Sequence, residues 1–161
     1  MANHIGKTLW VAQAHPATND TAGFEALTWV QVNGLQVLPT LGGSHNLIDV
    51  EDLAVGEVTA EKGAHSGNDS TMSFYTVAAD AGQIDIKEQA DDDAGALSVR
   101  IVTGSGTDSG SGPAPVTGDP VVYAQGIAHS YVDNEGNVSN HDGFQVGFRQ
   151  NLKKVTGTVP A

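Results

Sequence analysis

Short segments in which apolar and polar residues alternate recur along the 161-residue chain, with glycines between them. A period of two is typical of strands with one buried face, whereas a helix repeats every 3.6 residues. Glycine occurs 20 times and charged residues make up only 16% of the chain, which favours short strands and turns over salt-bridged helices. The clearest segments are residues 9–11, 27–32, 72–77, 97–101 and 144–149. The pattern predicts a mainly β fold of antiparallel strands.

The last third of the chain predicts a local hairpin. Residues 121–132 read as one long strand, and Gly126 in its middle would allow a bulge. The stretch DNEGN, residues 133–137, is typical of a turn, and FQVGFRQ would be the returning strand.

One helix is expected after residue 80. Asp80 has the residue type of an N-cap and Gln83 follows three positions later, the spacing of a capping box. Gly95 would close the segment.

The segment Thr103–Asp119 is rich in glycine and serine and could be an interdomain linker. Only 42 residues follow it, however, which is too few for a second core without cysteine or metal. We therefore expect one domain spanning residues 1–161, with this segment as a long loop.

Composition limits the function. The chain has 19 acidic and 7 basic residues, a net charge of −12, which disfavours a protein that grips nucleic-acid phosphates. It has no cysteine, so disulfides and cysteine-based zinc sites are excluded. No apolar run has the length of a signal peptide core or a membrane span, and we expect a soluble protein made in a cytoplasm, without membrane binding.

Catalytic motifs are missing from the sequence. It contains neither a Gly-x-Ser-x-Gly elbow nor a phosphate-binding glycine loop, and no two of its six histidines have helical ligand spacing. The run Asp91–Asp93 lacks the alternating acids of a calcium loop. We expect no enzyme activity and no cofactor, while an ion held by distant strands stays open.

The stretch VEDLAVGEVTAEKGAHSGNDS, residues 50–70, gathers carboxylates between glycines. Carboxylates that act on sugars need aromatic residues nearby, and this stretch has none. Its valines and Leu53 sit among the acids, as in an exposed hairpin or protruding loop. A solvated loop and an interface with another surface are both compatible with the pattern.

The order of these features resembles the major tail tube proteins of long, non-contractile-tailed bacteriophages, from about residue 7 to residue 155. The segments that carry the resemblance are KTLWV, LTWVQV, VEDLAVGEVTAEK, SFYTVAAD, LSVRIV and FQVGFRQNLKKV. The most specific part is the tryptophan-containing strand followed by Asp-Leu-x-x-Gly-Glu-x-Thr-Ala-Glu, at residues 52–61.

The resemblance implies two packed antiparallel sheets with one flanking helix, in a subunit that closes into hexameric rings. The rings would stack into a β-barrel tube with an acidic lumen, through which DNA passes during ejection without specific binding. It also implies tape-measure, tail-terminator and distal tail proteins as partners, and a location in the virion tail after assembly in the host bacterial cytoplasm.

The resemblance also assigns three segments by their position in the chain. Residues 50–70 would be an inter-ring loop, residues 1–7, approximately, an N-terminal arm, and residues 153–161, approximately, a C-terminal arm. The expected inter-ring residues are Asp52, Leu53, Val55, Glu57, Val58, Glu61 and Lys62, and the expected arm residues are Lys7, Lys153 and Lys154. It assigns no place to the 103–119 loop. The alternative is a β-sandwich module that binds carbohydrate or a receptor, which would need an exposed aromatic platform.

Overall fold

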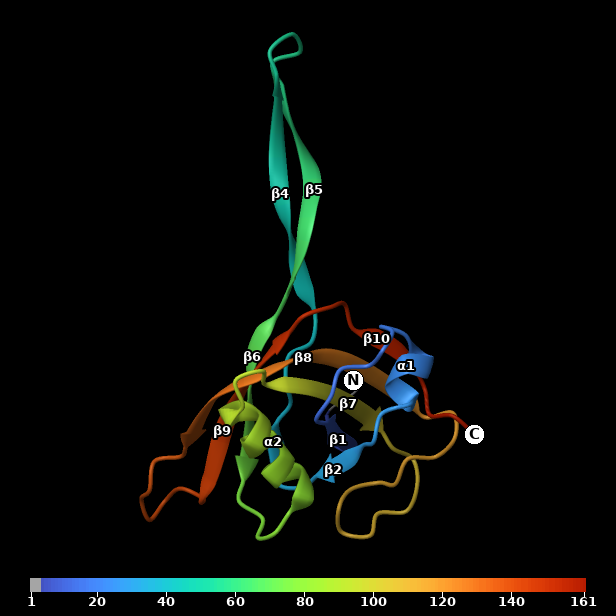
Figure 1. Ribbon diagram of the computed structural model, residues 1–161, viewed down its shortest axis with the longest axis vertical. Coiled ribbons are helices and arrows are strands. Elements are labelled where there is room, and N and C mark those ends of the chain that lie inside the picture. The colour runs from blue at the N-terminus through green and yellow to red at the C-terminus, as the bar shows by residue number, and fades with distance from the viewer. Residues whose placement is uncertain (1–3) are drawn as a thin grey trace.

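The computed structural model describes residues 4–161, which form ten strands and two helices (Figure 1). In chain order they are β1 (Lys7–Ala12), α1 (Thr21–Glu25), β2 (Val30–Val32), β3 (Leu35–Val37), β4 (Gly43–Asp52), β5 (Glu57–Gly67), β6 (Asp69–Tyr75), α2 (Ala81–Asp91), β7 (Ala96–Thr103), β8 (Pro120–Asp133), β9 (Gly143–Gln150) and β10 (Val155–Thr158). Neither helix within this part of the chain is long and apolar enough to cross a membrane.

Eight of the strands form one antiparallel sheet in the order β2-β1-β7-β8-β9-β6-β3, and β10 lies beside β8. The two strands at the ends of this path, β2 and β3, are joined by only Asn33 and Gly34, so the sheet curls until its edges meet at a corner. Gln83 of α2 bridges the corner, since its amide donates to the carbonyls of Asn33 and Tyr75, both at 2.8 Å. The edges meet there without pairing, and the barrel stays open.

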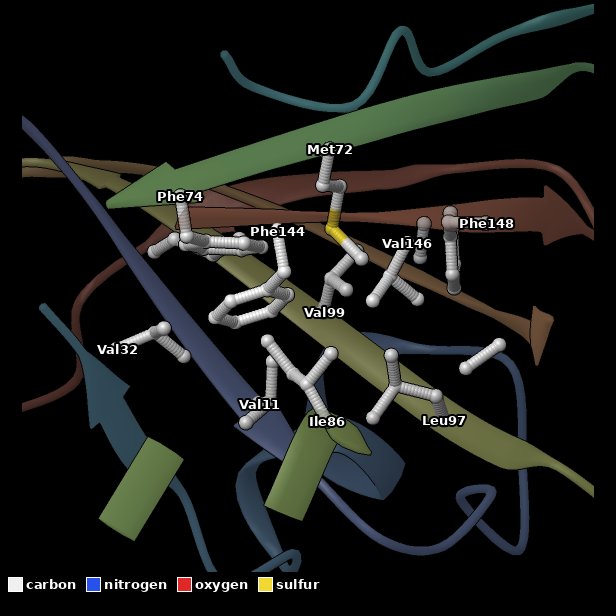
Figure 2. Close-up of a cluster of buried hydrophobic side chains, with 13 residues drawn as sticks. Val11, Val32, Met72, Phe74, Ile86, Leu97, Val99, Phe144, Val146 and Phe148 are labelled. Carbon is white, nitrogen blue, oxygen red and sulfur yellow. The ribbon is translucent and has the colours of Figure 1, made fainter. Parts of the chain in front are cut away.

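The main core lies inside this curl, under α2. Figure 2 shows side chains of β6 and β9 facing those of β1, β7 and α2. Phe144 lies near its centre, where its ring stacks on Phe74 at 5.1 Å between centroids and lies 5.5 Å from Tyr131. Ile86 is the fully buried apolar residue that α2 contributes. This core fixes the body of the protein.

A second apolar cluster covers the other face of the sheet. Phe24 of α1 stacks on Tyr123 of β8 at 5.1 Å, and Val102 and Val121 are buried beside them. Because both faces of β7 and the first part of β8 are covered, their residues 96–102 and 121–129 are buried or half-buried.

The predicted fold class is confirmed: the chain is mainly β, with two antiparallel sheets. The second sheet, however, is the two-stranded β4–β5 pair, which projects from the body and does not pack as a second layer (Figure 1). The expectation of a single helix missed α1, which is only five residues long and begins at the N-cap Asp20.

The predicted helix is confirmed as α2, with Asp80 as N-cap accepting from the Gln83 backbone N–H at 3.0 Å. The Gln83 side chain does not return to Asp80, because it is used at the sheet corner. The helix ends at Asp91, and Gly95, at φ 58°, lies beyond the end.

The bulge of β8 lies at Ser130 rather than at Gly126. One extra residue separates His129 from Val132 relative to β9, and Ser130 takes φ 56°. Gly126 pairs regularly with both neighbouring strands, and it is glycine because a Cβ there would come within 1.9 Å of the Arg149 carbonyl oxygen. The turn that follows β8 also differs from the expected one. It spans residues 134–142, so Asp133 still belongs to β8 and only residues 134–137 of DNEGN lie in the turn.

The glycine-rich segment connects β7 to its neighbour β8 and is held by a buried carboxylate, Asp119. Asp119 accepts from the Ser105 hydroxyl at 2.6 Å, the Ser105 N–H at 2.9 Å and the Val116 N–H at 2.7 Å. The Ser105 hydroxyl, followed by the backbone donors, lowers the pKa of Asp119 below its usual 3.8. The loop is therefore tied to the body despite its composition.

Candidate assembly surface

The β4–β5 hairpin projects from the body as its longest feature (Figure 1). Its ladder pairs residues from Gly43↔Gly67 at the base to Asp52↔Glu57 near the tip. At about 3.4 Å per residue, ten residues reach about 34 Å from the base. None of its residues is buried. An isolated two-stranded ribbon is only marginally stable in water, which points to a further contact surface.

The tip is a four-residue turn. Asp52 closes it by accepting from the Ala54 N–H at 2.8 Å on its side chain and from the Gly56 N–H at 2.9 Å on its backbone carbonyl. Gly56 has φ 66°, a conformation that glycine adopts without strain. The turn presents Leu53, which is 101% exposed, and Val55 to solvent.

The two faces of the hairpin carry different side chains, because residues paired across the ladder point to the same side. One face carries Asp52, Glu57 and Glu61 together with Ile48, Val50 and Thr59. The opposite face carries Val58 and Lys62 together with Leu47, Asp49, Glu51 and Ala60. The expected inter-ring residues therefore divide into an acidic face, a tip (Leu53 and Val55) and an opposite face.

The expected 50–70 loop leaves out most of β4, the first strand of the hairpin. Leu47, Ile48 and Val50 are 72%, 53% and 42% exposed, yet only Val50 lay within the expected 50–70 loop. The signal available in the sequence was the Asp52…Gly56 turn, since two strands of equal length must flank a hairpin turn. At the other end, residues 69 and 70 belong to β6 and lie in the body.

Basic groups surround the base of the hairpin. His45 and His65 face each other across the ladder with ring centroids 5.0 Å apart. Desolvation lowers the pKa of His45, and the positive charges of Lys62, His65 and Lys153 lower it further. The lowered pKa favours the neutral form of His45. Histidine and lysine side chains thus lie around the base, whereas the distal half carries the acids.

Of the two expected arms, residues 1–3 of the first lie outside the described residues. Lys7 begins β1 and pairs with Thr103. Lys153 and Lys154 are exposed and precede β10, which pairs with the start of β8. After β10, the Val159 N–H donates to the Asp119 carbonyl at 2.9 Å. In the single chain the C-terminal segment therefore lies on its own sheet.

Asp69, His129 and Ser130 form a chain of hydrogen bonds on the body. His129 Nε2 lies 2.9 Å from an Asp69 carboxylate oxygen, and its Nδ1 lies 2.8 Å from the Ser130 hydroxyl. The order is that of a catalytic triad, but the side chains of His129 and Asp69 are 35% and 48% exposed. A solvated site lacks the desolvation that strengthens transition-state electrostatics. The set fits a structural role at the β8 bulge.

Both tryptophans contact the side chain of Arg100. The Arg100 guanidinium lies 4.5 Å from the ring centre of Trp10 and 5.2 Å from that of Trp29. Burial of this group lowers the pKa of Arg100. Cation–π contacts occupy both indoles, so they do not form the flat exposed platform that sugar stacking requires.

No protein-family model and no curated protein matches the sequence. Solved structures do match the fold. A chain of the extracellular contractile injection system "PVC sheath-tube complex in extended state" aligns with a TM-score of 0.65 and 8% identity, covering 99% of this chain and 93% of that chain. A chain of the "PVC sheath/tube terminator in extended state" aligns at 0.63 and 9%, covering 98% and 97%. A chain of the anti-feeding prophage cap, described as a tube terminating cap, aligns at 0.58 and 10%, covering 94% and 88%.

At these identities the similarity shows the fold and nothing more. The matching chains belong to contractile injection particles, whereas the sequence resemblance pointed to long, non-contractile phage tails. The chain therefore shares its fold with chains of these injection-system complexes, and the comparison does not assign it to the non-contractile type.

Proposed function

We propose that the protein is a structural subunit that assembles into stacked hexameric rings, which form the tube of a phage or phage-like tail. The observation that carries this proposal is the β4–β5 hairpin, which exposes Leu47, Leu53 and Val58 on a ribbon without a core of its own. Exposed apolar surface of this kind marks an interaction site. The similarity to chains of sheath-tube and tube-terminator complexes supports a tube as the product of that interaction.

The two end strands of the sheet favour assembly into a ring. The sheet ends in two short edge strands, β2 and β3, and strand edges readily pair with another chain. Subunits that contact each other head to tail form a closed ring when the rotation from one subunit to the next adds up to a full turn. If six copies each supply four strands, about 24 strands tilted about 40° give a barrel roughly 48 Å in backbone diameter. Side chains on the inner face narrow this lumen, but it stays wide enough for a DNA duplex.

The charge of −12 suits a conduit for DNA. A lumen lined by carboxylates repels phosphates, so DNA slides through without binding. In this function the protein acts in the virion tail, after assembly in the host cytoplasm, and meets tape-measure, tail-terminator and distal tail proteins. It has no catalytic role, and whether the tail is contractile or non-contractile depends on the presence of a sheath.

Electron microscopy of the purified full-length protein, and of particles that contain it, tests the proposal. We expect stacked rings with sixfold symmetry and an open channel. A protein that stays monomeric at high concentration, both alone and with its tail partners, would contradict the proposal. A sheath around the tube in particles would exclude the non-contractile type.

A further inference from the structure

A groove of about 700 Å³ lies beside the edge strand β3. One wall is the continuous segment 35–41, which comprises β3 and the chain that leads to the hairpin. Leu35, Leu38 and Leu41 of this wall pack on the edge of the main core, as does Ile101 of β7. These four residues form the apolar floor of the groove, which is supported by the main core.

Every titratable side chain that lines this groove is basic. His4, Lys7 and Lys154 line it, and no carboxylate does. Only seven lysines and arginines occur in the chain, and others of them have neighbours elsewhere: Lys87 lies 4.5 Å above the Phe144 ring and Arg100 lies between the tryptophans. In a protein of net charge −12, an apolar groove with a purely basic rim is suited to an acidic, partly apolar ligand.

The distal half of the hairpin has this chemistry. Its acidic face carries Asp52 and Glu57 directly opposite each other, a like-charge pair that destabilises the isolated ribbon. Its tip adds the exposed Leu53 and Val55. A basic partner would relieve the repulsion, and an apolar floor would cover the tip.

We infer that the distal half of the hairpin of one copy binds in the β3 groove of a second copy. This inference rests on the proposed function and names the acceptor for the hairpin. Asp52, Glu57 and Glu61 lie toward Lys7 and Lys154, while Leu53 and Val55 lie on the leucine floor. Among the described residues β3 is paired only with β6, so the second copy meets a sheet edge that can accept it.

Disulfide trapping tests the contact directly, because the chain has no cysteine. The full-length variant Val37→Cys/Leu53→Cys places one thiol on the groove wall and one at the hairpin tip, both at exposed positions. We expect oxidation of assembled protein to give a ladder of covalent oligomers. The control Val138→Cys/Leu53→Cys moves the first thiol to an exposed residue outside the groove, and we expect no ladder from it.

Charge exchange provides a second readout. Lys7→Glu/Lys154→Glu and Glu57→Lys/Glu61→Lys should each lower the fraction of stacked rings about tenfold at limiting concentration, since several ion pairs reverse together. A mixture of the two charge-reversed proteins should restore stacking. Lys153→Glu is compared with the single variant Lys154→Glu, because it makes the same charge change one residue away and outside the groove lining.

The outcomes separate this inference from the proposed function. Normal stacked rings with no Val37–Leu53 ladder, or with an equal ladder from the Val138 control, would overturn the groove contact and leave the tube intact. A ladder together with restored stacking in the mixture would support the contact. Folded protein that forms no rings under any condition would overturn both.

Discussion

The body and the hairpin are built from the same kind of strand but differ in what covers their side chains. In the body, Leu9, Val99 and Phe148 are fully buried. In the hairpin, Leu47, Val55 and Val58 are between 61% and 72% exposed. The body thus completes its own core, whereas the apolar residues of the hairpin find no cover within the chain. β propensity alone therefore does not distinguish a strand that is buried in a core from one whose side chains stay exposed.

Removing the centre of the main core should have the largest effect. We expect Phe144→Ala to lower the free energy of unfolding by about 3–5 kcal/mol, because a large cavity replaces a ring packed against Phe74 and Tyr131. Urea unfolding followed by circular dichroism measures the loss. Val138→Ala, at a fully exposed position, is the control and should leave stability unchanged. Equal stability of the two variants would show that the body does not depend on this core.

Removing the N-cap of α2 should lower the free energy of unfolding by less than the core substitution does. Asp80→Ala should lower the free energy of unfolding by about 1–2 kcal/mol. Its carboxylate caps the Gln83 N–H and also accepts from the Asn33 side-chain amide at 2.7 Å, so it links the helix to the sheet corner. Asp80→Asn retains an N-cap acceptor and should recover part of the stability. Chemical denaturation of both variants checks the order; an alanine variant as stable as the asparagine variant would contradict it.

The Asp119 contacts should have a smaller effect, which depends on pH. Because the pKa of folded Asp119 lies below the usual value of 3.8, its stabilisation is complete above that value and is lost as pH falls through the folded pKa. Asp119→Asn should therefore lose stability relative to the wild type near neutral pH and show a smaller further loss below pH 3.8. Thermal unfolding across this range measures both curves. Parallel curves would indicate that Asp119 does not hold the loop through its charge.

The hairpin tip should have the smallest effect on the monomer. Leu53→Ser/Val55→Ser should change the free energy of unfolding by less than about 0.5 kcal/mol, because both side chains are exposed. The same variant should form few stacked rings, as counted in negative-stain images. Normal tubes from the tip variant would exclude the tip from the interface.

Much of the body could be predicted from the sequence because its signals are local. Period-two alternation located the strands at residues 9–11, 97–101 and 144–149, and Asp80 with Gln83 located the helix start. The prediction of a bulge at Gly126 was wrong, because a glycine in a strand has two explanations: a bulge, or a close approach of neighbouring backbone. At Gly126 the second applies, and the neighbour is β9, which only the folded chain brings there.

The candidate surface was predictable in part. The exposed acids and valines of residues 50–62 could be read from their pattern, whereas the facing residues 43–49 could be inferred only from the Asp52…Gly56 turn and not from their own pattern. Its run Leu47–Ile48 resembles a buried strand, and its exposure follows from where the hairpin leaves the body. The groove residues Lys7, Leu38 and Lys154 are far apart in the sequence, and no local pattern joins them.

The β class, the cap of α2, the acidity of the chain and its unusual acidic segment all follow from local sequence patterns. These properties depend on residues a few positions apart. Three other features appear only in the folded chain: the sheet curls until β2 and β3 meet, Asp119 holds the glycine-rich loop, and a basic groove lies beside β3. Those features depend on contacts between distant segments, which exist only after hydrophobic burial has brought the strands together.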